Sequence, residues 1–167
     1  RRLRLGGGGG CQEICRRFDV RIEFHFKVCL RLEASHNHLA FDLEYQAQAG
    51  EDLSKGDVVY VSGNSGNTPI VSKAQSNNNG AKMPAFGICT QSINNGSTGF
   101  IVTQGLITGI NTSAFTPGDT LYVSSTTAGG LANVSPAGES YKIQNIGKVV
   151  KSSNGGSILV GGAGRFN

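Results

Sequence analysis

The sequence predicts an all-β protein, and three observations carry that prediction. Short apolar runs separated by turn residues fill the chain from residue 51 onward, a strictly alternating stretch precedes them, and no segment shows sustained helical periodicity with a capping residue. At 167 residues the chain fits one domain with an appendage. We expect a compact β-barrel or sandwich built from two pseudo-repeats, preceded by an extended amphipathic β-ribbon and a flexible arm rich in Arg and Gly.

The first segment, residues 1–17, is predicted to be a flexible basic arm. It contains the glycine run Gly6 to Gly10, whose backbone freedom is typical of a linker. Seven of the eight arginines lie between Arg1 and Arg31, although the net charge of the chain is only +4. Acidic residues interrupt this arginine series. We therefore favour a solvated tail over docking to an acidic surface, and we expect no nucleic-acid partner.

Residues 18–45 are predicted to form an amphipathic β-ribbon. Every second residue from Phe18 to Leu32 is apolar, and the alternation returns from Leu39 to Tyr45, which is typical of a hairpin or of successive strands. Soluble proteins cover or charge such an apolar edge, so we expect this face to bind a partner. The predicted partner-binding residues are Phe18, Val20, Ile22, Phe24, Phe26, Val28 and Leu30.

Residues 46–167 are predicted to form the β module. From residue 51 onward, Gly, Ser, Thr and Asn supply 56 of the 117 residues and separate short apolar runs. The runs that we interpret as strands include 58–61, 100–103, 121–123, 148–150 and 158–160. No run approaches the roughly 18 apolar residues of a membrane helix, so we expect a soluble protein without a membrane partner.

The module contains an internal duplication, about 54–102 and 116–160. The segment from Ser54 to Ser62 matches the segment from Thr116 to Ser124, and each copy later reaches an Asn-Gly pair, a strong hairpin signal. A Gly at the third position of each opening turn suits the positive φ of a type II turn. Two copies favour a pseudo-twofold barrel or sandwich over a solenoid. The predicted structural turn residues are Gly56, Asp57, Gly118, Asp119, Asn95, Gly96, Asn154 and Gly155.

Four cysteines are too few for a disulfide scaffold in a chain of this length. They are Cys11, Cys15, Cys29 and Cys89. The spacing of Cys11 and Cys15, together with His36 and His38, can be drawn as a four-ligand zinc site. No second closely spaced cysteine pair exists, so we favour unpaired thiols or one bridge. We predict no metal and no cofactor.

No catalytic centre is predicted. Asp57 and Asp119 hold equivalent repeat positions and can be drawn as an acid and a base, but an Asp after a Gly turn more often accepts backbone N–H groups. All three histidines precede residue 39 and no G-x-S-x-G motif occurs, so a Ser-His-Asp triad has little to build on. The glycine run is not followed by the Gly-Lys-Ser/Thr sequence that ends a phosphate-binding loop. Tyr60 and Tyr122 can be drawn as carbohydrate-stacking platforms, although packing is the commoner role.

Five motifs in the body together resemble a known kind of module. They are Ser54-Lys-Gly-Asp-Val-Val-Tyr-Val-Ser-Gly63, Met83-Pro-Ala-Phe-Gly-Ile88, Asn95-Gly-Ser-Thr-Gly-Phe-Ile-Val-Thr-Gln-Gly-Leu106, Asn111-Thr-Ser-Ala-Phe-Thr-Pro-Gly-Asp-Thr-Leu-Tyr-Val-Ser124 and Gly155-Gly-Ser-Ile-Leu-Val160. The region from about Tyr45 to Gly162 resembles a β module that recurs in tail-fibre, head-fibre and capsid-decorating proteins of tailed bacteriophages. The resemblance implies a virion component and no reaction, and it does not extend to residues 1–34.

From these features we expect a non-enzymatic virion structural protein, a capsid decoration or cement protein that binds the shell through its amino-terminal arm and ribbon. Its partners would be other virion proteins, either the major capsid protein or neighbouring copies, and the resemblance implies a homotrimer located in the virion. Strand addition by residues 18–32 would supply backbone hydrogen bonds and one apolar face. The alternative is a tail-fibre or head-fibre module that recognises host glycans through its polar loops. An enzyme acting on envelope polysaccharide is the third hypothesis.

Overall fold

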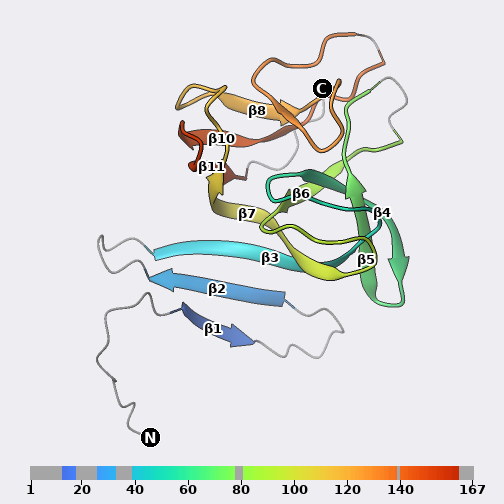
Figure 1. Cartoon of the computed structure of the whole chain (residues 1–167), viewed down its shortest axis with the longest axis vertical. Helices are drawn as coiled ribbons and strands as arrows, with labels where there is room; N and C mark the ends of the chain where they lie inside the picture. Colours follow the sequence, from blue (N-terminus) through green and yellow to red (C-terminus); the bar gives the residue numbers. More distant parts are fainter. Residues whose placement is uncertain (1–12, 18–25, 33–38, 78–80, 139, 162–167) are drawn as a thin grey trace, which may run out of the picture.

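The computed structural model describes residues 13–17, 26–32, 39–77, 81–138 and 140–161. Every helix or strand in this part of the chain is a β-strand, as the all-β class predicts (Figure 1). The strands are β1 (Glu13–Arg17), β2 (Phe26–Leu32), β3 (Leu39–Ala49), β4 (Val58–Ser65), β5 (Thr68–Lys73), β6 (Ala85–Cys89), β7 (Thr98–Ile110), β8 (Thr120–Val123), β9 (Leu131–Ala132), β10 (Asn145–Lys151) and β11 (Gly156–Val160). The described residues include no helix long and apolar enough to cross a membrane.

Hydrogen bonds join the strands in the order β1-β2-β3-β5-β4-β6-β7-β11-β10-β8-β9. An additional pairing of β3 with β7 closes β3, β5, β4, β6 and β7 into a ring. The pairing of β3 with β5 is parallel, and every other pair is antiparallel. Beyond the ring, β11, β10, β8 and β9 continue from β7 as an open sheet.

The amino-terminal strands extend the sheet outward from β3 (Figure 1). The antiparallel register of β2 and β3 sets Phe26 opposite Tyr45 and Val28 opposite Leu43, so the two apolar series of the sequence lie in phase. Strands β2 and β3 are consecutive in the chain and pair antiparallel. Strand β1 lies within the segment for which the sequence predicts a flexible arm. Its sequence does not alternate between apolar and polar residues, and it is recognised as a strand by its antiparallel pairing with β2.

The buried apolar residues form two clusters. The first cluster contains Ala47, Ala49, Leu53, Val59, Val71, Cys89, Ile93 and Ile101. The second contains Val58, Ala74, Ile88, Val102, Ile107, Ile110, Leu121, Val123, Ile146, Val149, Ile158 and Val160. The first draws its members from the ring strands and the loops between them, whereas the second joins ring strands to β8, β10 and β11.

Three strands of the ring contribute to both clusters. On β4, Val58 belongs to the second cluster and Val59 to the first, and adjacent residues of β6 and β7 divide in the same way. Successive side chains of a strand point to opposite faces, so β4, β6 and β7 bury both faces and separate the two clusters. A strand buried on both faces has a continuous apolar run, which is the pattern that the sequence shows at these positions.

Strand β7 passes from the ring to the open sheet at Gly105. Residues 98–104 pair with β3, and residues 105–110 pair with β11. Gly105 has a φ of +135°, and a Cβ there would collide with Asp42 of β3. The Oδ1 atom of Asp42 accepts the N–H of Leu106 at 2.9 Å. Gly105 and the Asp42 carboxylate thus fix the point at which β7 leaves the ring and joins the open sheet.

Candidate binding site

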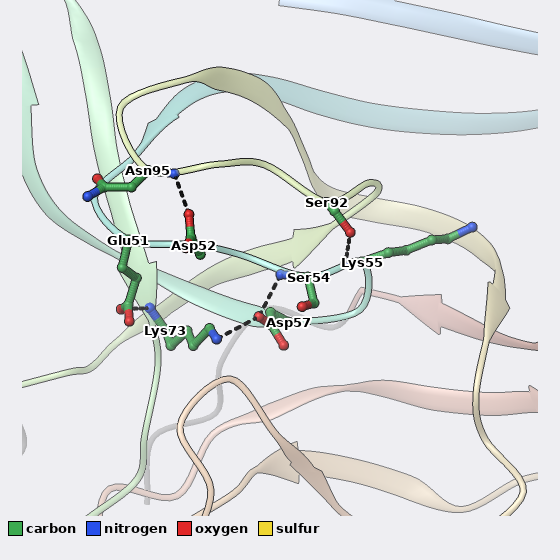
Figure 2. A network of polar contacts seen from close by, with 8 residues as sticks. All are labelled: Glu51, Asp52, Ser54, Lys55, Asp57, Lys73, Ser92 and Asn95. Carbon is green, nitrogen blue, oxygen red and sulfur yellow. Dashed lines mark hydrogen bonds and ion pairs between the residues drawn. The ribbon is translucent and has the colours of Figure 1, made fainter.

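The loop that leads into β4 is held in place by carboxylates that accept backbone N–H groups (Figure 2). Glu51 Oε1 accepts the N–H of Lys73 at 2.9 Å, and Asp52 Oδ1 accepts the N–H of Asn95 at 2.8 Å. Both N–H groups belong to segments distant in sequence. The acidic residues of this loop therefore satisfy backbone donors of the ring and give the loop a defined shape.

The loop ends in the tight turn that the sequence predicts at residues 54–57. The N–H of Asp57 donates to the carbonyl oxygen of Ser54 at 3.0 Å, and Gly56 at the third position has a φ of +94°. The Asp57 side chain closes the turn from the other side, because its Oδ2 atom accepts the N–H of Ser54 at 2.9 Å. This is the local backbone role expected of an Asp after a Gly turn.

The Asp57 carboxylate has one engaged oxygen and one that faces elsewhere. Lys73 Nζ lies 3.5 Å from Oδ2, and the two side chains are 28% and 20% exposed for Lys73 and Asp57. Figure 2 shows Oδ1 turned away from Ser54 and Lys73, and the Lys55 side chain extending away from the carboxylate. Oδ1 makes no hydrogen bond within the described chain. One acceptor of a mostly buried carboxylate is thus available to an outside donor.

The matching turn at residues 116–119 has the same internal hydrogen bonds. Asp119 N–H donates to Thr116 O at 3.0 Å, Thr116 N–H donates to Asp119 Oδ2 at 2.9 Å, and Gly118 also has a φ of +94°. Asn133 Nδ2 donates to the same Oδ2 atom at 3.0 Å. The Thr116 N–H, and secondarily Asn133, hold the pKa of the Asp119 carboxyl below its ordinary value. In the described residues, no hydrogen bond or ion pair joins Asp119 to Asp57.

A cavity of about 350 Å³ lies beside Asp57. Three stretches that are far apart in the sequence line it, namely residues 55–57, 110–115 without Thr112, and 129–131. The lining combines the Asp57 carboxylate and the polar side chains of Asn111 and Ser113 with apolar groups, among them the half-buried Phe115. A concave site of mixed lining and this size falls in the range that holds small ligands.

Glycine backbone lets the walls of the cavity approach one another. Gly129 has a φ of +75°, and a Cβ at this position would lie 3.1 Å from Asp57 Cγ. Its N–H donates to Ala74 O at 2.8 Å, and its carbonyl oxygen accepts the N–H of Val58 at 2.9 Å. These two hydrogen bonds attach the 129–131 wall to the start of β4 and to the residue that follows β5, and they fix its position against Asp57.

The cavity occupies an open seam of the fold. In the ring, β5 pairs with β4 on one side and with β3 on the other. Strand β9 pairs with β8 in the register that corresponds to β5 on β4, but it gains no second neighbour among the described strands. Residues 110–111, at the end of β7, face the cavity together with residues 129–131. In the ring, the pairing of β5 with β3 closes the corresponding space. Beside β9 no such pairing is present among the described strands, and the cavity occupies that space.

Cys89 lies beside this region but offers no reactive group. It is a free, fully buried cysteine, and its N–H donates to Asp57 O at 2.9 Å. Burial raises the pKa of its thiol to about 12, with the nearby Asp57 carboxylate acting in the same direction and Lys73 against it. A thiol in such surroundings stays protonated and inert at neutral pH.

The two predicted Asn-Gly turns are present. Ser97 N–H donates to Asn94 O at 3.0 Å, and Gly156 N–H donates to Ser153 O at 3.1 Å, so each Asn-Gly pair occupies the centre of a tight turn. Gly96 has a φ of +78°. The turn at Asn154 and Gly155 joins β10 to β11 directly.

Most of the predicted partner-binding and zinc residues lie where the structure gives little or no detail. Phe18, Val20, Ile22 and Phe24 lie outside the described residues, and Phe26, Val28 and Leu30 are described only as backbone positions of β2. Cys11, His36 and His38 also lie outside. The register of β1 and β2 sets Cys15 opposite Cys29. The described residues contain no group of three or more His, Cys, Asp or Glu side chains suited to a metal ion.

Sequence reasoning identified Asp57 as a turn residue but missed the cavity beside it. Asn111 and Phe115 fall within a motif of the resemblance, yet nothing in their local pattern marks them as lining a ligand site. Gly129 belongs to a polar loop, and its requirement for positive φ next to Asp57 depends on tertiary packing. Comparison of the chain with protein families, with curated proteins and with solved structures gave no match.

Proposed function

We propose that the chain is a non-enzymatic structural protein of a tailed-phage virion, a capsid decoration protein that binds the shell through its amino-terminal arm and ribbon. The motifs between residues 45 and 162 support the virion assignment through their resemblance to phage structural modules. The observation that carries the anchoring role is the register of β2 on β3. It sets apolar residues opposite one another along a sheet that continues beyond the ring, so a neighbouring chain can cover this apolar face. Because β2 already pairs with both β1 and β3, the partner would contact this face rather than add a strand to β2.

We further propose that the body is a duplicated β-barrel or sandwich in which β9 leaves the second half open. The matched hydrogen bonds of the turns at 54–57 and 116–119 support the duplication, and the closed ring of β3, β5, β4, β6 and β7 supports the barrel. A non-enzymatic role is supported by the two equivalent carboxylates, each of which accepts the N–H that begins its own turn.

The test is association of the full chain with phage particles that lack it. Phe24→Asp with Phe26→Asp places two charges in the apolar series, and His25→Asp with Lys27→Asp places two in the polar series of the same ribbon. Co-sedimentation with particles should be lost for the first pair and retained for the second. Equal binding by wild type and the Phe24 and Phe26 double variant would refute anchoring by the ribbon.

A further inference from the structure

We propose that the cavity beside Asp57 is a binding site for a single saccharide residue, engaged through its hydroxyl groups and one apolar ring face. This inference concerns the seam between residues 110–115 and 129–131 and does not depend on the ribbon. The proposal of particle association and the proposal of saccharide binding can therefore be tested, and refuted, independently of each other.

The polar groups of the cavity match what a sugar hydroxyl needs. Each hydroxyl donates one hydrogen bond and accepts others. Asp57 supplies an acceptor through Oδ1, because Oδ2 is already occupied by the Ser54 N–H and Lys73. A partly buried carboxylate forms charge-assisted hydrogen bonds with such donors, which are stronger than neutral ones.

Asn111 and Ser113 supply the complementary groups. Asn111 Oδ1 accepts both the N–H of Ser113 at 3.1 Å and its hydroxyl at 2.7 Å, so the amide orientation is set by the chain itself. This leaves the Nδ2 group of Asn111 as a donor and the Ser113 Oγ lone pairs as acceptors. The cavity thus presents an acceptor on one wall and a donor with an acceptor on the other before any ligand arrives.

Apolar side chains complete the site. Phe115 and Leu131 line the cavity and also pack against the second core cluster, which holds them in position. The C–H face of a sugar ring packs against an aromatic or aliphatic surface while its hydroxyls bind polar groups. A ligand with only charged groups would leave these apolar side chains in contact with water, and a purely apolar ligand would bury Asp57 Oδ1 without a hydrogen-bond donor.

The walls are already fixed, so binding costs little reorganisation. The backbone hydrogen bonds of Gly129 to Val58 and Ala74 hold one wall, and the closed turn at 54–57 holds the base. Rigid walls favour affinity because less conformational freedom is lost on binding.

The experiment is an NMR titration of the isotope-labelled full chain with methyl glycosides of glucose, mannose, galactose and N-acetylglucosamine, and with free glucuronic acid. At least one should shift the amide signals of Gly56, Gly129 and Gly130 in a saturable way. Asp57→Asn keeps an oxygen for the Ser54 N–H but replaces Oδ1 with a donor, and should weaken that binding at least tenfold. Asp119→Asn alters the equivalent turn, which does not line the cavity, and should bind as wild type does.

A second variant guards against a merely structural effect. Ala114 is exposed and lines the cavity, so Ala114→Trp fills the space without disturbing a core residue and should abolish the shifts. The proposal is overturned if no saccharide gives saturable shifts at these amides, or if Asp57→Asn and Ala114→Trp both bind as tightly as wild type. Unchanged particle association by Asp57→Asn is the expected companion result, because the cavity is separate from the ribbon.

Discussion

At the scale of single residues, two glycines lie where neighbouring strands approach each other closely. A Cβ at Gly87 would collide with the carbonyl oxygen of Val102, and a Cβ at Gly147 would collide with that of Leu159. The two positions correspond in the duplicated pattern, which pairs Phe86-Gly87 with Ile146-Gly147. The sequence shows the repetition of these glycines, but the backbone contact that requires them exists only in the folded sheet.

Gly147→Ala should therefore destabilise the fold. The obstructing atom belongs to backbone, which cannot rotate away, and overpacking of this kind costs roughly 1 to 3 kcal/mol. Gly155→Ala is the matched control, because Gly155 has open space around its Cβ position and is not among the positive-φ glycines. Urea unfolding should give a lower midpoint for Gly147→Ala and a change within about 0.5 kcal/mol for Gly155→Ala. Equal midpoints for the two variants would contradict the argument.

The thiol of Cys89 should make stability fall at alkaline pH. Its pKa is about 12 in the folded state, whereas an unfolded cysteine ionises near 8.5. The contribution is fully present below the unfolded pKa and is lost as pH rises toward the folded one, at up to about 1.4 kcal/mol per pH unit. Under reducing conditions, the stability difference between wild type and Cys89→Ala should shrink by roughly 2 kcal/mol between pH 7 and pH 10. A constant difference would show that the thiol titrates alike in both states.

At the scale of elements, a side-chain amide joins β6 to the segment before β10. Gln144 is 7% exposed, its Oε1 accepts the N–H of Ala85 at 2.7 Å, and its Nε2 donates to Ala85 O at 2.9 Å. Ser76 Oγ also donates to Lys142 O in the same neighbourhood. These bonds tie a ring strand to the open sheet where no strand pairing connects them.

Gln144→Ala should destabilise the protein by roughly 2 to 6 kcal/mol, because it removes the partner of a backbone donor and of a backbone acceptor, and each loss costs about 1 to 3 kcal/mol. Gln48→Ala provides the comparison. Gln48 Nε2 also donates to a backbone carbonyl, that of Gly96 at 2.8 Å, but this bond is exposed and water can replace it. Denaturant unfolding should separate the two variants clearly. A loss for Gln144→Ala no larger than for Gln48→Ala would mean that water enters the Ala85 site.

The elements also show how far local sequence chemistry reaches. The turns at Gly56 and Gly118 follow from residue types within four positions, and the structure has both with the same φ. The strands at 58–61 and 121–123 follow from their apolar runs. Strand β1 and the parallel pairing of β3 with β5 do not, because they depend on partners elsewhere in the chain. The cavity has the same origin, since its three walls come from separate parts of the sequence.

At the scale of the whole molecule, the shared strands make the two apolar clusters inseparable. Val58 and Val59 are neighbours in sequence yet belong to different clusters. If β4 leaves the sheet, both clusters therefore lose a buried residue at once. The duplication of the sequence therefore does not imply two independent domains. Strand β9 ends the sheet, and its outer edge has no strand partner in the described chain.

The ribbon bears on the assembly of the whole molecule. Residues 18–32 carry three phenylalanines in one apolar series, and ring strands of the body already pack against β8, β10 and β11 through the second cluster. Coverage of the ribbon by other chains would remove an aggregation-prone surface. We therefore predict an oligomer, a trimer by resemblance to phage components, whose contacts involve the ribbon.

Sedimentation velocity of the full chain tests this assembly. Wild type should sediment as a trimer, and Phe24→Asp with Phe26→Asp should sediment as a monomer, because two charges in the apolar series cannot be buried without partners. Its circular dichroism should still report a folded body, since the described members of both core clusters lie between Ala47 and Val160. His25→Asp with Lys27→Asp adds the same number of acidic groups to the polar series, and should remain a trimer if the apolar face makes the contact. A stable monomer for the wild-type chain would defeat the prediction, because the ribbon would then need no second copy to cover it.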